Sequence, residues 1–264
     1  MGEQTRLTPA LRREVKAVAK IHILSQLPLC AAAAGAYIIP MVLLSMVTAV
    51  PINASLQYMA AMFAASFFCQ ACLLGPIMLG MQYFFVDVAR GHGSGMAVVF
   101  SPLGQVQELL RGIRMTFCLA FRMMLLSLIP SAVYLGAAYL SSIWLERQGI
   151  MDNQTVMLVL CLLVAAYLLM MLPVLAYAVS YQLGYAFLRD DPGIGVWQAT
   201  AQGSRLLRGQ RRASLSFLLS FLPWYVGGLF TCGLTTLFGL IYESVALFIL
   251  KDRLCAAQDM FIPK

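Results

Sequence analysis

Residues 155–188 read TVMLVLCLLVAAYLLMMLPVLAYAVSYQLGYAFL and contain no Asp, Glu, Lys or Arg. A helix of about 20 apolar residues is long enough to cross a hydrocarbon core about 30 Å thick. The whole chain of 264 residues has the same character, because 61% of its residues are apolar and only 11% are charged, whereas a soluble domain carries about 25% charged residues. The sequence therefore predicts a helical integral membrane protein.

Six apolar segments follow one another along the chain. They are residues 21–50, 56–86, 115–145, 155–188, 213–231 and 234–250. The last two could form one long helix, but Thr231-Cys232-Gly233 offers a turn of small residues, and each segment is just long enough to cross the bilayer. We expect a hairpin there. The predicted fold is all-α, a polytopic bundle of six transmembrane helices in a single membrane domain, residues 1–264.

The basic residues bear on this topology, because Lys and Arg accumulate on the cytoplasmic side of a membrane protein. With six spans, every one of the 18 Lys and Arg residues except Arg147 falls on the same side. With one helix in place of the last hairpin, Lys251, Arg253 and Lys264 would lie on the opposite side. The charges therefore favour six spans with both termini in the cytoplasm.

The architecture repeats three times along the chain. A basic amphipathic segment, here called an elbow, precedes each pair of spans, at residues 7–20, 104–114 and 197–212. Each returning span ends in an apolar run and an aspartate, namely Asp87, Asp190 and Asp252. We therefore expect three elbow-plus-hairpin units.

The elbows carry cations that suit the membrane surface. A basic amphipathic helix lies in the interface with its cations among anionic headgroups; the alternative is that these residues only set the topology. The predicted headgroup contacts are Arg12, Arg13, Lys16, Lys20, Arg205, Arg211 and Arg212. Aromatic stacking platforms are not interleaved with the cations, so anionic lipid is the expected partner and nucleic acid is not.

A series of short motifs follows in order along the second half of the chain, at residues 201–209 (AQGSRLLRG), 215–217 (LSF), 220–224 (SFLPW) and 231–234 (TCGL). With these motifs the chain resembles the bacterial family known as domain of unknown function 975 (DUF975), and the likeness extends over about residues 11–254. The chain departs from the family pattern at Val174, where a glycine would follow Pro173, and at Ile241, where a proline would precede Tyr242. The resemblance implies a multi-pass protein of the bacterial cytoplasmic (inner) membrane with no established biochemical role.

The sequence shows no pattern of catalytic or metal-binding residues. Cys69 and Cys72 have the spacing of half a zinc site, but no second pair or His cluster accompanies them. No Ser, Cys or carboxylate has a recognisable base beside it, as an activated nucleophile requires. We expect no enzymatic activity, no cofactor and no metal.

Glu243 is the acidic residue placed near the middle of a predicted span, about 12 Å from Lys251 along the sixth helix. An acid in the membrane costs roughly 2.5 to 3.5 kcal/mol on insertion scales and usually faces the bundle interior. Arg122 has a similar predicted depth, and Gln82 and Gln182 lie on the other returning helices. These four residues form the candidate intramembrane polar site. Glu243 either joins helices as a protonated hydrogen-bonding group or handles an ion, proton or substrate.

Two classes of function follow from these features. The short outer connections, basic elbows and missing catalytic pattern favour a membrane scaffold or accessory subunit that binds a membrane-protein partner or a second copy of the chain. Prolines in five of the six spans, together with the repeat, instead favour a small transporter or lipid-handling protein that uses a polar layer around Glu243.

Overall fold

The computed structural model describes residues 7–48, 55–148, 152–231 and 233–259, and within these ranges the chain forms helices and turns without strands. The predicted all-α fold is therefore confirmed. Among the described residues, five helical stretches are long and apolar enough to cross a membrane: Leu27–Val47, Gln57–Ala89, Val106–Arg147, Gln154–Asp190 and Leu234–Ala257. The predicted outer connections include residues 51–54, 149–151 and Cys232, which lie outside the described residues.

The first of the three predicted units begins with α1 (Pro9–Ser25), whose N-terminus is capped by Thr8. The Thr8 hydroxyl accepts a hydrogen bond from the Leu11 amide at 3.2 Å. α1 continues past residue 20, the predicted end of the elbow, and the first span starts only with α2 (Leu27–Val47). Pro28 explains this boundary, because proline lacks the N–H donor of a helix interior and suits a first turn.

The returning half of this unit consists of α3 (Leu56–Cys69), a π-helical turn η1 (Gln70–Leu74) and α4 (Gly75–Ala89). Hydroxyl groups of Thr48 and Ser66 lie 3.2 Å apart, which joins the end of α2 to α3. Pro76, which has no backbone N–H to donate, follows directly after this π-helical turn.

In the second unit, α5 (Ala97–Phe100) and η2 (Ser101–Leu103) precede one helix of 42 residues, α6 (Val106–Arg147). The chain therefore does not break between the predicted elbow, residues 104–114, and the span that follows it. Gly112 lies at this point and lets α6 approach α4 closely, because a Cβ there would lie 2.6 Å from the Cα of Pro76. The return is α7 (Asn153–Gln182) followed by α8 (Gly184–Asp190).

The third unit comprises α9 (Val196–Leu206), α10 (Arg211–Leu219), α11 (Leu222–Phe230) and α12 (Leu234–Asp259). The segment predicted as one span, residues 213–231, is broken into α10 and α11. Pro223 is the reason, because it donates no backbone hydrogen bond and disfavours a helical residue before it. Between α11 and α12, Gly233 turns the chain with a φ of 87°, and its amide donates to the carbonyl of Gly228 at 2.8 Å.

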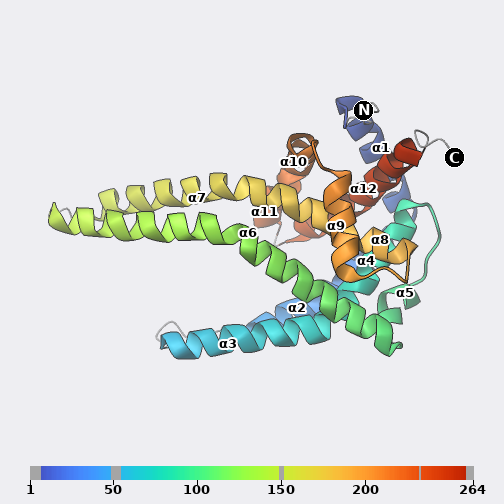
Figure 1. Cartoon of the computed structure of the whole chain (residues 1–264), viewed down its shortest axis with the longest axis horizontal. Helices are drawn as coiled ribbons and strands as arrows, with labels where there is room; N and C mark the ends of the chain where they lie inside the picture. The colour runs from blue at the N-terminus through green and yellow to red at the C-terminus, as the bar shows by residue number, and fades with distance from the viewer. Residues whose placement is uncertain (1–6, 49–54, 149–151, 232, 260–264) are drawn as a thin grey trace.

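The helical hairpins project from a common base (Figure 1). The α2–α3 and α6–α7 pairs extend away from a region where α1, α4, α8, α9 and α12 gather, and both ends of the described chain lie near that region. The base holds the main core, because Phe84, Tyr185, Leu188 and Phe248 there are almost fully buried. In contrast, only 6% of the most apolar stretch of α7 is buried.

Candidate functional site

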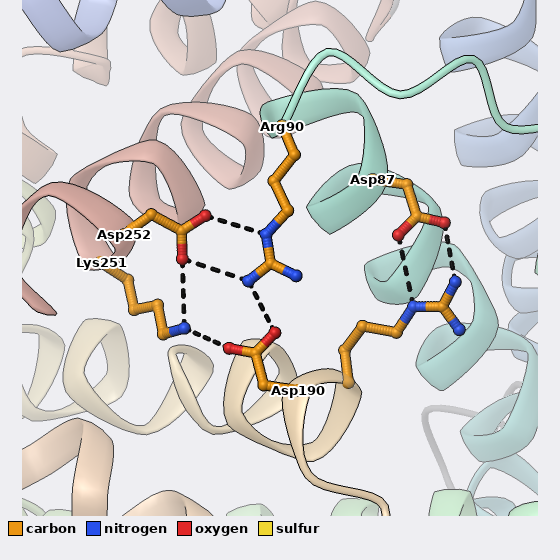
Figure 2. A network of polar contacts seen from close by, with 6 residues as sticks. Asp87, Arg90, Asp190, Lys251 and Asp252 are labelled. Carbon is orange, nitrogen blue, oxygen red and sulfur yellow. Dashed lines mark hydrogen bonds and ion pairs between the residues drawn. The ribbon is translucent and has the colours of Figure 1, made fainter. Parts of the chain in front are cut away.

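Charged residues at the ends of the three returning helices form a network in the base, here called the helix-end junction (Figure 2). The junction consists of Asp87, Arg90, Arg189, Asp190, Lys251 and Asp252. It therefore combines three acidic and three basic side chains. The three aspartates are those that the sequence repeat aligns at the helix ends, and the structure brings all three into one region.

Arg90 connects all three helices. Its guanidinium donates to Asp252 of α12 at 2.9 Å and lies 2.6 Å from a carboxylate oxygen of Asp190 on α8. Lys251 bridges the same two carboxylates, bonding to Asp190 and lying 3.1 Å from Asp252. The hydrogen bonds of Arg90 itself, first to Asp252 and then to Asp190, raise the pKa of its guanidinium, so its positive charge is retained at all physiological pH values.

An ion pair between Arg189 and Asp87 completes the junction. The guanidinium of Arg189 donates to the two carboxylate oxygens of Asp87 at 2.9 and 3.3 Å, and the Ser94 hydroxyl donates to the same carboxylate at 2.8 Å. Each charge in the junction thus has an opposite partner. Such a neutral arrangement suits a clamp between helices, because it leaves no excess charge to bind a ligand.

Glu243 lies on α12 and is 8% exposed. Its carboxylate accepts a hydrogen bond from the hydroxyl of Tyr225 on α11, a partner that the sequence did not predict. Both residues line a pocket of about 270 Å³ together with Gln182 of α7. The rest of this lining is apolar and consists of Leu175, Ala178, Val179, Leu218, Leu219 and Leu222.

The other two residues of the predicted polar site lie elsewhere. Arg122 donates to the backbone carbonyl of Trp197 at 3.2 Å, and its guanidinium lies 4.6 Å from the centre of the Trp197 ring. Its stacking on α9 gives the cation an alternative to Glu243, and no described ion pair joins the two residues. Gln82 is buried on α4 and does not line the Glu243 pocket. The structure therefore unites only Gln182 and Glu243 of the four.

The predicted headgroup contacts divide into three groups. Arg12, Arg13 and Lys16 gather in a cleft between α1 and α10. Arg211 instead bonds to the hydroxyl of Tyr177 at 2.5 Å and lies over its ring. Three further cations are exposed at the surface outside the cleft, namely Lys20, Arg205 and Arg212.

Cys69, at the end of α3, and Cys72, in η1, are both exposed free thiols. Across the described ranges, no group of three or more His, Cys, Asp or Glu side chains is placed to hold a metal ion.

Five long apolar helices and the amphipathic α1 indicate a helical multi-pass membrane protein. Residues 12–256 match the family described as protein of unknown function (DUF975), and the chain belongs to that family. The resemblance drawn from the motifs is thus confirmed over nearly the same range. Comparison with curated proteins and with solved structures gave no match.

Proposed function

We propose that this protein is a scaffold or accessory subunit of the bacterial cytoplasmic membrane, without enzymatic activity, that holds a partner membrane protein along its α6–α7 hairpin. In this proposal the chain crosses the membrane six times and both termini are cytoplasmic. α10 and α11 together make the fifth crossing, since residues 211–230 reach about 30 Å at 1.5 Å per residue despite the break.

The observation that carries the proposal is the exposure of the α6–α7 hairpin. The most apolar stretches of α6 and α7 are only 11% and 6% buried, against 50% in α12. α6 alone is about 63 Å long at 1.5 Å per residue, and a ring contact of 5.0 Å between Tyr134 and Tyr167 joins it to α7. The hairpin is thus one long unit that offers most of its surface to lipid or to another membrane protein.

The helix-end junction supports the same role from the other end of the molecule. It ties α4, α8 and α12 by ion pairs, so the hairpins project from a base in which the charges of the junction are paired with one another. A fixed base with projecting helices is suited to holding a partner. The separation of Arg122 from Glu243 also removes the charge pair that a polar pathway through the bundle would use.

Photo-crosslinking in native membranes tests the proposal. A photoreactive amino acid replaces Leu162 of α7, which is 61% exposed, and in a matched control it replaces Phe63 of α3, which is 76% exposed. We expect a discrete adduct with another membrane protein from position 162 and mainly lipid adducts from position 63. Lipid adducts alone at position 162, and at further exposed positions such as Leu158 and Leu169, would overturn the proposal.

The Glu243 pocket favours a second candidate, a small transporter or lipid-handling protein. A carboxylate, a phenol and an amide converge there within apolar walls, as in sites where a few polar groups orient a ligand. Reconstitution distinguishes the two candidates. A transporter that uses this acid should carry protons into liposomes in a way that Glu243→Gln abolishes, whereas a scaffold should give the leak of protein-free liposomes with either chain.

A further inference from the structure

A small basic cleft lies between the N-terminal helix α1 and α10, and it plays no part in the proposed scaffold role. Its volume is about 200 Å³. It is lined by Pro9, Arg12, Arg13, Lys16, Ser216, Phe217 and Ser220. Segments about 200 residues apart in the sequence therefore build it.

Two hydrogen-bonded pairs of side chains cross the cleft from α1 to α10. Arg12 and Lys16 are four residues apart and lie on successive turns of α1. The guanidinium of Arg12 donates to the Ser216 hydroxyl at 2.8 Å, and the Lys16 ammonium donates to the hydroxyl of Ser220. Cationic N–H groups and hydroxyls thus alternate around one small space.

The positive charge of the cleft is not neutralised. Its lining includes three cations and no carboxylate, and no ion pair among the described residues involves Arg12, Arg13 or Lys16. Glu14 of α1 instead pairs with Arg253 of α12 at 3.1 Å. Partial burial, and then the repulsion from Arg12, lower the pKa of Lys16. A bound anion would relieve this repulsion.

Arg12, one of the residues that line the cleft, also has a buried donor that lacks an acceptor. The Nε atom of Arg12 is buried and has no hydrogen-bond partner among the described residues. Buried N–H groups are nearly always paired, so each exception calls for an explanation such as a bound ion. The Ser216 hydroxyl accepts a hydrogen bond from another nitrogen of this guanidinium, Nη1, and so leaves Nε without a partner.

We propose that this cleft binds one phosphate group, either as a phosphodiester or as inorganic phosphate. Arg12 would meet two phosphate oxygens with its planar guanidinium, Lys16 and Arg13 would supply further charge, and the two serine hydroxyls would complete the shell. The phosphate can come from a phospholipid headgroup or from free phosphate. Binding would fasten the N-terminal helix to α10 and so stabilise the third hairpin.

The proposal is tested with the purified full chain in neutral detergent. The probes are inorganic phosphate, dihexanoylphosphatidylglycerol, and dihexanoylglycerol as the matched lipid without phosphate, each titrated while binding is measured. The variants are Arg12→Gln and Lys16→Gln, with Lys20→Gln as the control, because Lys20 carries the same charge on the same helix but is exposed outside the cleft.

We expect saturable binding of the phosphatidylglycerol by the unmodified chain and by Lys20→Gln, and roughly tenfold weaker binding by Arg12→Gln and Lys16→Gln, as for loss of a charged hydrogen bond. Dihexanoylglycerol should not bind at this site. If inorganic phosphate binds with the same pattern, the phosphate group alone suffices; if only the phospholipid does, the source is a lipid headgroup.

Equal affinities in all the variants, or no saturable binding of either phosphate probe, would overturn the proposal. Ser216→Ala keeps every charge and serves where a cation variant does not fold. It should weaken binding roughly threefold, the effect of one neutral hydrogen bond. Equal affinities of Ser216→Ala and the unmodified chain would then contradict the proposal.

Discussion

Replacing Lys251 by methionine is the sharpest perturbation of the helix-end junction. The Lys251 side chain is 6% exposed and bridges Asp190 and Asp252, whose side chains are 31% and 34% exposed. Methionine keeps most of the length of the side chain but loses the cation–π contact with the Phe187 ring, over which the ammonium lies at 4.8 Å. The substitution therefore removes one charge with little change in volume, and Arg90 is left alone with two carboxylates.

The size of the effect follows from the burial of the partners. Depriving a fully buried ion pair of one member costs about 3 to 5 kcal/mol, whereas an exposed pair contributes about 0 to 1 kcal/mol. Because the two carboxylates keep about a third of their exposure, the free energy of unfolding should fall by about 2 kcal/mol, between these limits. For a chain of this size that corresponds to a fall of about 5 °C in the unfolding midpoint.

Thermal unfolding of the purified chain in detergent, followed by tryptophan fluorescence, measures this change. The control is Arg253→Gln, which breaks the pair between Arg253 and Glu14, whose side chains are 54% and 55% exposed, and should lower the midpoint by no more than about 2 °C. Asp190→Asn introduced beside Lys251→Met should recover part of the loss, because it restores neutrality. If Lys251→Met falls no further than Arg253→Gln, the junction does not stabilise the base as argued.

Three further predictions concern packing, the membrane acid and topology. Gly203→Ala should lower the free energy of unfolding by about 1 to 3 kcal/mol, and with it the unfolding midpoint, because its Cβ would lie 2.3 Å from the carbonyl oxygen of Ser180. The control Gly95→Ala should leave the midpoint unchanged, because its Cβ would meet no atom within 4 Å. Glu243→Gln should unfold within about 1 kcal/mol of the unmodified chain, since an amide still accepts from Tyr225, while Glu243→Leu should lose about 1 to 3 kcal/mol in the same assay. Alkaline phosphatase fused to the C-terminus should be inactive; activity there would contradict the six-span topology.

Local properties of the chain were enough to predict its all-α class and to mark the three helix ends that carry an aspartate. Hydropathy indicates which segments suit lipid, and the three helix ends with Asp87, Asp190 and Asp252 are visible as a pattern in the sequence. Thr8 acts through its own backbone neighbours, so the start of α1 can be inferred from the sequence. The break at Pro223 is equally local, but residues 213–231 were predicted as one span. The continuity of α6 could not be predicted from the sequence. The predicted elbow and the span after it have the same helical backbone geometry, so the pattern shows neither a break nor its absence where they join.

The partners of the charged residues depended on the tertiary structure. Arg90 and Asp252 are 162 residues apart, and their pairing exists only because α4 and α12 converge in the base. Arg122 was placed in one polar site with Glu243 from its predicted depth alone. Depth does not specify the direction of a side chain around its helix, and in the structure the Arg122 guanidinium lies over the Trp197 ring. The sequence alone indicates which segments suit a membrane and where charge accumulates, because these are sums over neighbouring residues. Only the packing of helices decided which charges meet, because a hydrogen bond requires two groups to lie about 3 Å apart, whatever their separation along the chain.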